Sequence, residues 1–169
     1  MTAHFIASLK NGLTGEGISV VCAHGKGGVI DAASKREGDG ASPLGVWRMK
    51  RVFWRPDRLD RPETGLPAAP LRPHDGWCDD AGDPLYNRPV HLPYAAGHER
   101  LWRDDQVYDI IVELDHNSDP VVPDAGSAIF FHLARPDYSP TEGCIAVSRA
   151  DMLDILKHCG PGSVLEITA

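Results

Sequence analysis

Glycine and proline interrupt this chain so often that its apolar residues fall into short runs, and this feature constrains the fold most strongly. The 169 residues include 17 Gly and 14 Pro. Short apolar runs separated by turn-forming residues are typical of many brief β-strands. We predict strands at residues 18–23, 46–53, 108–114, 128–133, 144–147 and 164–167. The sequence therefore predicts a mainly β fold.

A single segment, residues 149–158, has the pattern of a helix, because its apolar residues recur at helical spacing. Ser148 precedes it as a predicted N-cap, and Asp151 is an acidic residue in the first turn, where the helix dipole favours it. Gly160 is expected to stop the helix. The predicted fold therefore has one helix, or at most two.

Residues 57–99 form a long stretch that is rich in proline and has no clear strand pattern. This stretch also carries Trp77, Tyr86 and Tyr94, and aromatic residues favour an ordered, packed segment over a flexible linker. No internal repeat is visible. We therefore predict one domain over residues 1–169 with a long central loop insertion at about 57–99.

The formal net charge of −7 at pH 7 gives the chain no overall attraction for nucleic acid or anionic lipid. No stretch approaches the roughly 18 apolar residues that span a bilayer, and the N-terminal residues lack the pattern of a secretory signal. We expect no nucleic-acid or membrane partner. We also expect a cytoplasmic location, or a periplasmic one if a leader precedes this sequence. The four cysteines form no C-x-x-C pair, so free thiols are expected.

The densest chemical signal lies between residues 127 and 148, where one apolar run ends at His132 and a second begins at Gly143 and Cys144. If these strands are neighbours, the short connection brings His132 and Cys144 to the same end of a sheet. A thiol attacks acyl carbon as the thiolate, and an imidazole about 3 Å away can remove its proton. Gly143 permits close backbone approach, and consecutive N–H groups there can bind an oxyanion. The pattern predicts a cysteine acyl-transfer enzyme with Cys144 as nucleophile and His132 as general base.

Two other interpretations of these residue types stay open. A cysteine among apolar residues is often a small core residue, and a histidine at a strand end is often structural. Thiol and imidazole groups that could bind a metal lie near one another in sequence at Cys22 and His24, at His74 and Cys78, and at His158 and Cys159. None of these pairs has a recognised zinc-finger spacing, so neither a metal nor another cofactor is predicted.

The candidate catalytic segment resembles the signature of the L,D-transpeptidase (YkuD-type) family. That signature is an apolar strand ending in His, a variable loop, and then Ser/Thr-His-Gly-Cys with an aliphatic residue. This chain has Phe-Phe-His at residues 130–132 and Thr-Glu-Gly-Cys-Ile at residues 141–145. Ser-Pro-Leu-Gly at residues 42–45 is similar to a second family segment. The resemblance covers the chain from about Lys35 onward.

The resemblance implies a β-sandwich catalytic domain that acts on the stem peptides of peptidoglycan. It implies that Cys144 attacks the carbonyl of the L-centre of meso-diaminopimelate and expels the terminal D-alanine, with His132 as base. Gly143 and Cys144 match the positions that donate the oxyanion N–H groups. Leu133 cannot orient the imidazole by its side chain, so a backbone carbonyl has to hold the tautomer.

Three features depart from the family pattern. Glu142 replaces the usual His before Gly-Cys, and Ala146 replaces the Arg or Asn often found two residues after the cysteine. The interval from histidine to cysteine is short, so the loop over the site is expected to be remodelled. The predicted substrate-binding residues, among which the arginines are candidates for binding the substrate carboxylate, are Arg103, Arg135, Ser139 and Thr141.

The acyl-enzyme can be resolved by water, as in an L,D-carboxypeptidase, or by an amine, as in a transpeptidase that cross-links the cell wall. A cytoplasmic enzyme would meet soluble muropeptides during peptidoglycan recycling, with water as the abundant acceptor. We therefore expect a cytoplasmic L,D-carboxypeptidase that releases D-alanine from tetrapeptides. A cell-wall transpeptidase and a non-catalytic muropeptide-binding module are the alternatives.

Overall fold

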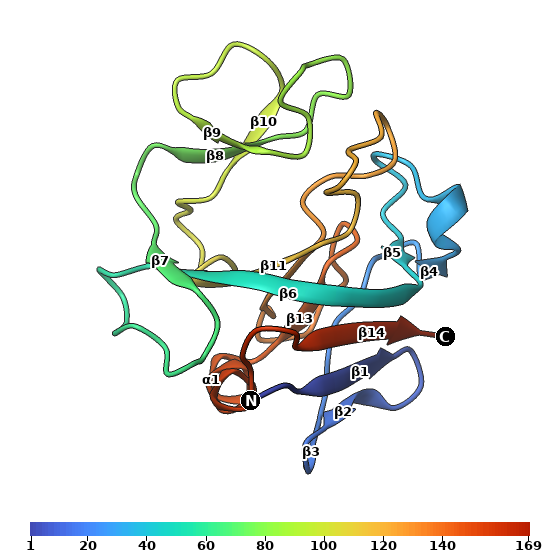
Figure 1. Ribbon diagram of the computed structural model, residues 1–169, viewed down its shortest axis with the longest axis vertical. Coiled ribbons are helices and arrows are strands. Elements are labelled where there is room, and N and C mark those ends of the chain that lie inside the picture. Colours follow the sequence, from blue (N-terminus) through green and yellow to red (C-terminus); the bar gives the residue numbers. More distant parts are fainter.

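The computed structural model describes residues 1–169, and its main body is a nine-stranded sheet (Figure 1). Its strands are β1 (His4–Ser8), β2 (Gly12–Gly15), β3 (Ile18–Val20), β6 (Gly45–Trp54), β7 (Ala68–Pro70), β11 (Ile110–Leu114), β12 (Phe130–Leu133), β13 (Ile145–Val147) and β14 (Val164–Thr168). Eight of them follow the order β13-β12-β11-β6-β14-β1-β2-β3, and β7 pairs with β6. A separate pair, β4 (Val29–Ile30) and β5 (Ser42–Pro43), flanks the 3-10 turn η1 (Ala32–Ser34). The mainly β prediction is confirmed.

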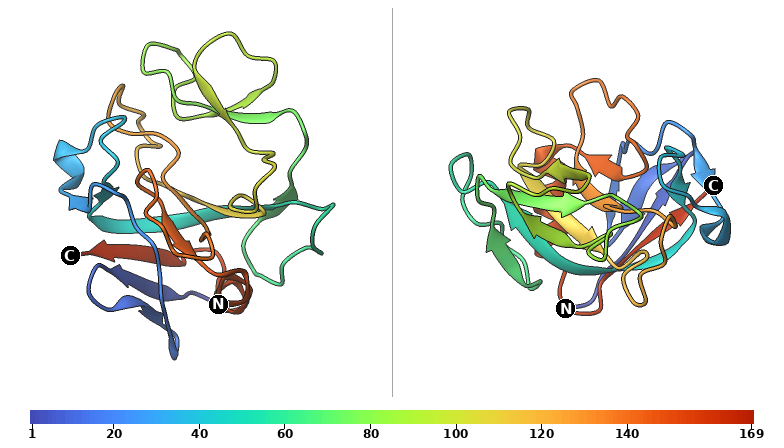
Figure 2. Two further views of the ribbon diagram at one scale, coloured as in Figure 1. Left: turned by 180° about the vertical axis from the view of Figure 1, so that it is seen from behind. Right: turned by 90° about the horizontal axis from the view of Figure 1, so that it is seen from above.

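The main sheet bends round until its two ends approach each other, which makes the arrangement sandwich-like (Figure 2). Ala23, just after β3, exchanges two backbone hydrogen bonds with Ala146 in β13, at 2.8 and 3.0 Å. A core of 21 buried residues fills the interior, and it includes Phe5 on β1, Phe131 on β12 and Leu165 on β14. This core holds the strands that carry the candidate site.

Every predicted strand is present, although some of the ends shift. The strand predicted at 18–23 stops at Val20, and the one predicted at 46–53 extends over Gly45–Trp54. β1 and β2 were not predicted. β1 exposes Ile6 and buries the small Ala7, so its hydrophobic alternation is weak in the sequence.

The one α-helix, α1 (Arg149–Lys157), lies where it was predicted. The Ser148 side chain accepts a hydrogen bond from the backbone N–H of Asp151, which confirms the N-cap. Gly160 does not stop the helix, because the C-cap is His158 in a right-handed conformation. A side chain at Gly160 would lie 2.4 Å from the carbonyl oxygen of Met1. Glycine at this position instead lets the N-terminal segment pass close by.

Replacing Ser148 by alanine is expected to lower the free energy of unfolding by about 1 kcal/mol, because an N–H of the first helical turn loses its acceptor. Urea unfolding followed by circular dichroism measures the change. Ser148→Asp is the matched control and should retain most of the stability, since a carboxylate also caps a helix. Equal losses in both variants would contradict the capping role.

The central insertion is more ordered than the predicted loop. It contains a three-stranded sheet in the order β10-β8-β9, formed by β8 (Asp75–Cys78), β9 (Pro89–His91) and β10 (His98–Arg100). This small sheet stands apart from the main sheet in Figure 1. Trp77 on β8 reaches down to Phe130 on β12, and their ring centroids are 5.0 Å apart at 86°. The aromatic residues of the insertion therefore pack the small sheet onto the main body, and the insertion contains strands that the sequence did not predict.

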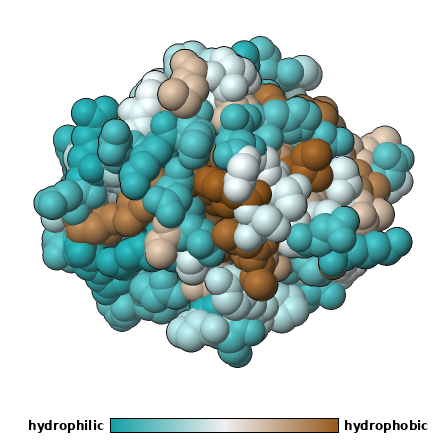
Figure 3. Space-filling model, turned by 90° about the horizontal axis from the view of Figure 1, so that it is seen from below, coloured by the Kyte–Doolittle hydropathy of each residue, from teal (hydrophilic) through white to brown (hydrophobic).

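No helix in the structure is both long and apolar enough to cross a bilayer. The face seen from below in Figure 3 is mostly hydrophilic, with a hydrophobic area near its centre.

Candidate active site

Cys144 and His132 lie on the same face of two neighbouring parallel strands. His132 on β12 stands opposite Ala146 on β13, and Cys144 is two residues before Ala146, so both side chains point to one side of the sheet. Phe131 and Leu133 point to the other side and belong to the main core. The thiol and the imidazole both line one cavity of about 510 Å³. The alternation of β12 thus places both catalytic candidates on the face opposite the main core, where Cys144 belongs to a second, smaller buried cluster with Phe130.

The imidazole of His132 is held by a backbone carbonyl. Its Nδ1 lies 2.9 Å from the carbonyl oxygen of Leu133, which can only accept, so Nδ1 carries the hydrogen and Nε2 is left as the base. The Tyr108 ring packs edge-on against the imidazole with centroids 5.3 Å apart. The pKa of His132 is lowered to about 4, mainly by burial; the hydrogen bond to Leu133 opposes this shift, and the charges of Arg103 and Arg135 contribute to it. The ring is therefore neutral at pH 7.

The Cys144 thiol makes its hydrogen bonds to the backbone and not to His132. Sγ accepts from the N–H of Phe130 at 3.3 Å and donates to the carbonyl oxygen of Ala128 at 3.2 Å. The pKa of this thiol is raised to about 12, mainly by burial; the hydrogen bond from Phe130 opposes this shift, and the charge of Glu99 contributes to it. The expected thiol–imidazole hydrogen bond of about 3 Å is absent at rest. The resting pair is a neutral thiol beside a neutral imidazole, because burial penalises both charged forms.

Gly143 shapes the backbone before the nucleophile. Its φ is +137°, and a side chain there would lie 2.9 Å from the carbonyl oxygen of Ala41, so glycine is needed. The N–H of Gly143 donates to Thr141 Oγ1 at 3.1 Å, and the Thr141 hydroxyl donates to the carbonyl oxygen of Cys144 at 2.6 Å. The N–H of Cys144 has no hydrogen-bond partner. The predicted pair of oxyanion donors is therefore reduced to one free N–H in the resting site.

Replacing Thr141 by valine is expected to lower the rate of acylation of Cys144 about tenfold. Valine keeps the shape of the side chain but removes the hydroxyl that holds Gly143 and Cys144, so the oxyanion N–H is less well positioned. The rate of covalent labelling by a carbapenem, followed by intact-protein mass spectrometry, measures this step. Thr141→Ser retains the hydroxyl and should stay within about threefold of the wild type; a wild-type rate for the valine variant would contradict the role.

The two candidate arginines line the same cavity and share one carboxylate. Arg103 makes two hydrogen bonds to Asp105, at 2.8 and 2.7 Å, and Arg135 approaches the same carboxylate at 3.4 Å. Ser139 and Thr141 also line the cavity. The structure thus brings all four predicted substrate-binding residues to one site. Because Arg135 is half exposed and makes only the longer contact, it is the freer of the two arginines to meet a substrate carboxylate.

Several cavity residues, among them Tyr108, Glu99 and Lys35, were not singled out from the sequence. Tyr108 appears there only as the first residue of a predicted strand, and Glu99 only as the last residue of the insertion. Lys35 is buried, and its ammonium group binds Asp39 and the carbonyl oxygen of Arg36. The contact between the insertion and the main sheet brings Glu99 to the site, and a sequence read along its length carries no signal for such a contact.

Glu142, which replaces the usual His, also lines the cavity and forms an exposed ion pair with Lys26 at 2.8 Å. The other thiol and imidazole candidates from the sequence lie away from the cavity. All four cysteines are free. No group of three or more His, Cys, Asp or Glu side chains has an arrangement that could hold a metal ion.

Comparison with protein families connects this geometry to a known class. The family model of the YkuD L,D-transpeptidase catalytic domain matches residues 2–167, which is nearly the whole chain. The match therefore includes the N-terminal strands and the insertion as well as the segment around Cys144. Comparisons with curated proteins and with solved structures found no significant match.

Proposed function

The chain belongs to the YkuD family of L,D-transpeptidase catalytic domains, which are cysteine-nucleophile enzymes that act on peptidoglycan, and we propose that it is an L,D-carboxypeptidase. Its proposed substrate is a soluble muropeptide with a tetrapeptide stem, and its product is free D-alanine. The observation that carries this proposal is that Cys144 and His132 share one cavity under the insertion.

In the proposed first half-reaction, the sulfur of Cys144 attacks the carbonyl carbon at the L-centre of meso-diaminopimelate. The S–C bond forms while the thiol proton passes to Nε2 of His132, and the free N–H of Cys144 stabilises the oxyanion. The C–N bond then breaks, and His132 returns the proton to the amine nitrogen of the departing D-alanine. A neutral thioester remains on the enzyme. Transfer of the thiol proton during the attack suits this site, because the raised pKa of Cys144 disfavours a free thiolate.

The proposal that water is the second substrate is supported by the insertion, which covers part of the cavity. Asp79 and Glu99 of the insertion line the same space as Cys144, and its volume of about 510 Å³ is that of a small-molecule site. One stem peptide occupies much of such a space. A water molecule can still enter, whereas the amine of a second, wall-bound peptide needs a wider opening.

Incubation with a disaccharide-tetrapeptide, followed by mass spectrometry of the protein and the products, tests this function. We expect a transient acyl adduct on Cys144 and accumulation of free D-alanine and tripeptide. Cross-linked dimers in place of hydrolysed product would refute the hydrolase and favour a transpeptidase. Binding of the muropeptide without acylation would favour a non-catalytic binding module.

We also propose that the enzyme acts in the cytoplasm, where soluble muropeptides return for recycling. The supporting feature is again the cavity partly covered by the insertion, because such a cavity suits a short soluble peptide better than a polymer. Cell fractionation followed by immunoblotting tests the location, and recovery of the protein with the cell envelope would contradict it.

A further inference from the structure

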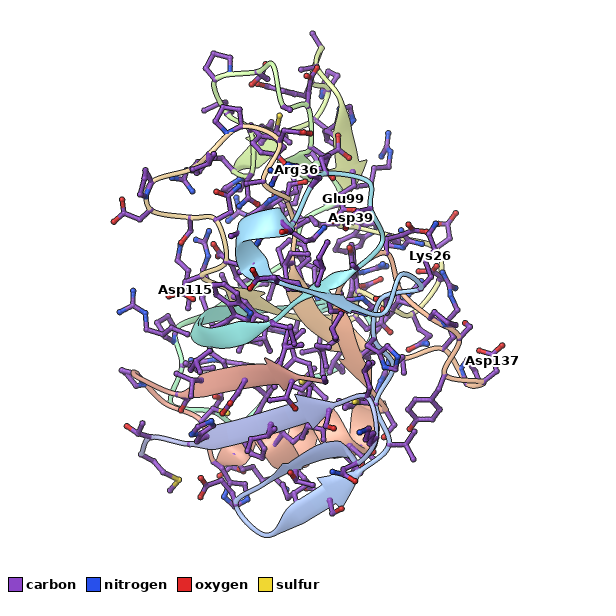
Figure 4. The ribbon with its side chains drawn as sticks, turned by 90° about the vertical axis from the view of Figure 1, so that its right-hand side faces the viewer. Lys26, Arg36, Asp39, Glu99, Asp115 and Asp137 are labelled. Atoms are coloured by element: carbon purple, nitrogen blue, oxygen red, sulfur yellow. The ribbon has the colours of Figure 1, made fainter.

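Glu99 places a carboxyl group in the cavity of Cys144 and His132, and the first half-reaction does not use it. Glu99 on β10 stands opposite Trp77 on β8, so both side chains point from the same face of the small sheet. Trp77 packs against Phe130 of the main sheet, so Glu99 also points toward the main sheet. Figure 4 shows Glu99 at the level where the insertion meets the main body.

A hydrogen bond fixes the position of this carboxyl group. Tyr108 Oη donates to Glu99 Oε1 at 2.8 Å, and the Tyr108 ring packs edge-on against His132. Glu37 also lines the cavity, but it already accepts hydrogen bonds from the hydroxyls of Tyr86 and Ser127. Glu99 is thus the carboxyl group that is tied directly to the surroundings of His132.

The protonation of Glu99 is set by groups from both sides of the cavity. The titratable and charged groups that face it are Tyr108, Asp79, Arg103, Glu37, Cys144, His132 and Lys35. Enclosure between the insertion and the main sheet raises the pKa of Glu99 to about 7, and the hydrogen bond from Tyr108 opposes this rise. A carboxyl group with this pKa can both accept and return a proton near neutral pH.

We propose that Glu99 is the general base of the second half-reaction, a role that rests on the proposed hydrolase function. Its carboxylate accepts a proton from the water whose oxygen attacks the thioester carbon. The O–C bond forms, the C–S bond breaks, and the proton passes from Glu99 to the departing sulfur of Cys144. The stem peptide leaves with a new terminal carboxyl group, and the free enzyme is restored.

The charges in the site make Glu99 better suited to assist deacylation, the second step, than acylation, the first. A negative Glu99 opposes formation of a thiolate at Cys144 and therefore hinders acylation. In the second step Glu99 becomes neutral when it accepts the proton from water, so this repulsion is gone when the sulfur departs. His132, whose pKa is lowered to about 4 by burial, is a weak base for a bound water. The pKa of Glu99, at about 7, makes its carboxylate a better base for water at neutral pH.

Glu99→Gln separates the two steps, because it removes the carboxylate base that only the second step needs. Glutamine keeps the shape of the side chain and can still accept the hydrogen bond from Tyr108. With the disaccharide-tetrapeptide, we expect one equivalent of D-alanine to be released at the wild-type rate or up to a few times faster. Steady-state turnover should fall about 100-fold or more, and the acyl adduct on Cys144 should accumulate in the mass spectrum. Turnover of the wild type should also rise with pH through about 7, and this dependence should be absent in the variant.

Asp80→Asn is the matched control, because it removes an exposed carboxylate from the same insertion but outside the cavity. It should show normal turnover and no accumulated adduct. If Glu99→Gln turns over normally, or if both of its steps slow equally, Glu99 is not the base for water. If the wild type itself is never acylated by the tetrapeptide, the proposed function fails, and the role of Glu99 fails with it.

Discussion

Replacing Cys144 by alanine is expected to abolish the acyl adduct and to lower turnover of a tetrapeptide muropeptide by at least about 10⁴-fold. The nucleophile is removed, and no other thiol lines the cavity. Release of D-alanine and intact-protein mass spectrometry measure the two effects on the same sample. Residual turnover within about tenfold of the wild type would exclude Cys144 as the nucleophile.

The other cysteines provide the control for this result. Cys22 is half-buried and lies outside the cavity, so Cys22→Ala should retain both the adduct and the turnover. Thermal unfolding of both variants checks that any loss of activity is chemical and not a loss of the fold. If Cys22→Ala loses the adduct while Cys144→Ala keeps it, the labelled thiol has been misassigned.

Replacing His132 by glutamine is expected to lower acylation at pH 7 by about 10³- to 10⁴-fold, because the thiol then has no neutral base beside it. With a thiol pKa of about 12, only about 10⁻⁵ of the thiol is ionised at pH 7. The rate in the variant should therefore increase about tenfold per pH unit between pH 7 and 10, as the thiolate fraction grows. The wild type should instead be flat over this range and lose activity as the pH falls toward 4, where His132 becomes protonated.

Carbapenem acylation measures this step without the complication of deacylation. His98→Gln is the matched control, since His98 Nδ1 also contacts a backbone carbonyl, that of Ala96, but His98 does not line the cavity. The control should acylate like the wild type. A His132 variant with a wild-type rate and a flat pH profile would show that the proton leaves the thiol by another route.

Local sequence patterns were sufficient to predict the strands and the helix around the site. The alternation of apolar residues along β12 and β13 determines which residues enter the core, and it leaves His132 and Cys144 on the opposite face. Ser148 marked the start of α1 for a similarly local reason, since a cap contacts residues within one turn. Gly143 was identified because glycine permits close backbone approach, and the structure shows that its φ of +137° also favours glycine.

The hydrogen-bond pattern inside the site was not predictable in the same way. The N–H of Gly143 is occupied by Thr141, and the thiol of Cys144 is bound by the backbone around Phe130 and Ala128. The contacts of the thiol depend on how the segment around Phe130 packs beside Cys144, which no local pattern specifies. The contact of Gly143 depends on the orientation of the Thr141 side chain, which the residue types alone do not fix. The family motif alone therefore did not indicate that the N–H of Gly143 is bonded to Thr141 in the resting site.

The sequence by itself determined the mainly β fold, the nucleophile and base candidates, and the family, because each follows from periodicity or from residues close together in the chain. Only the tertiary structure decided that the insertion folds into a sheet over the cavity and brings Glu99 to Tyr108. Trp77 anchors that sheet on Phe130 through a contact between residues more than fifty positions apart. Such contacts form when separately folded segments bury apolar surface together, and no local pattern specifies which surfaces will meet.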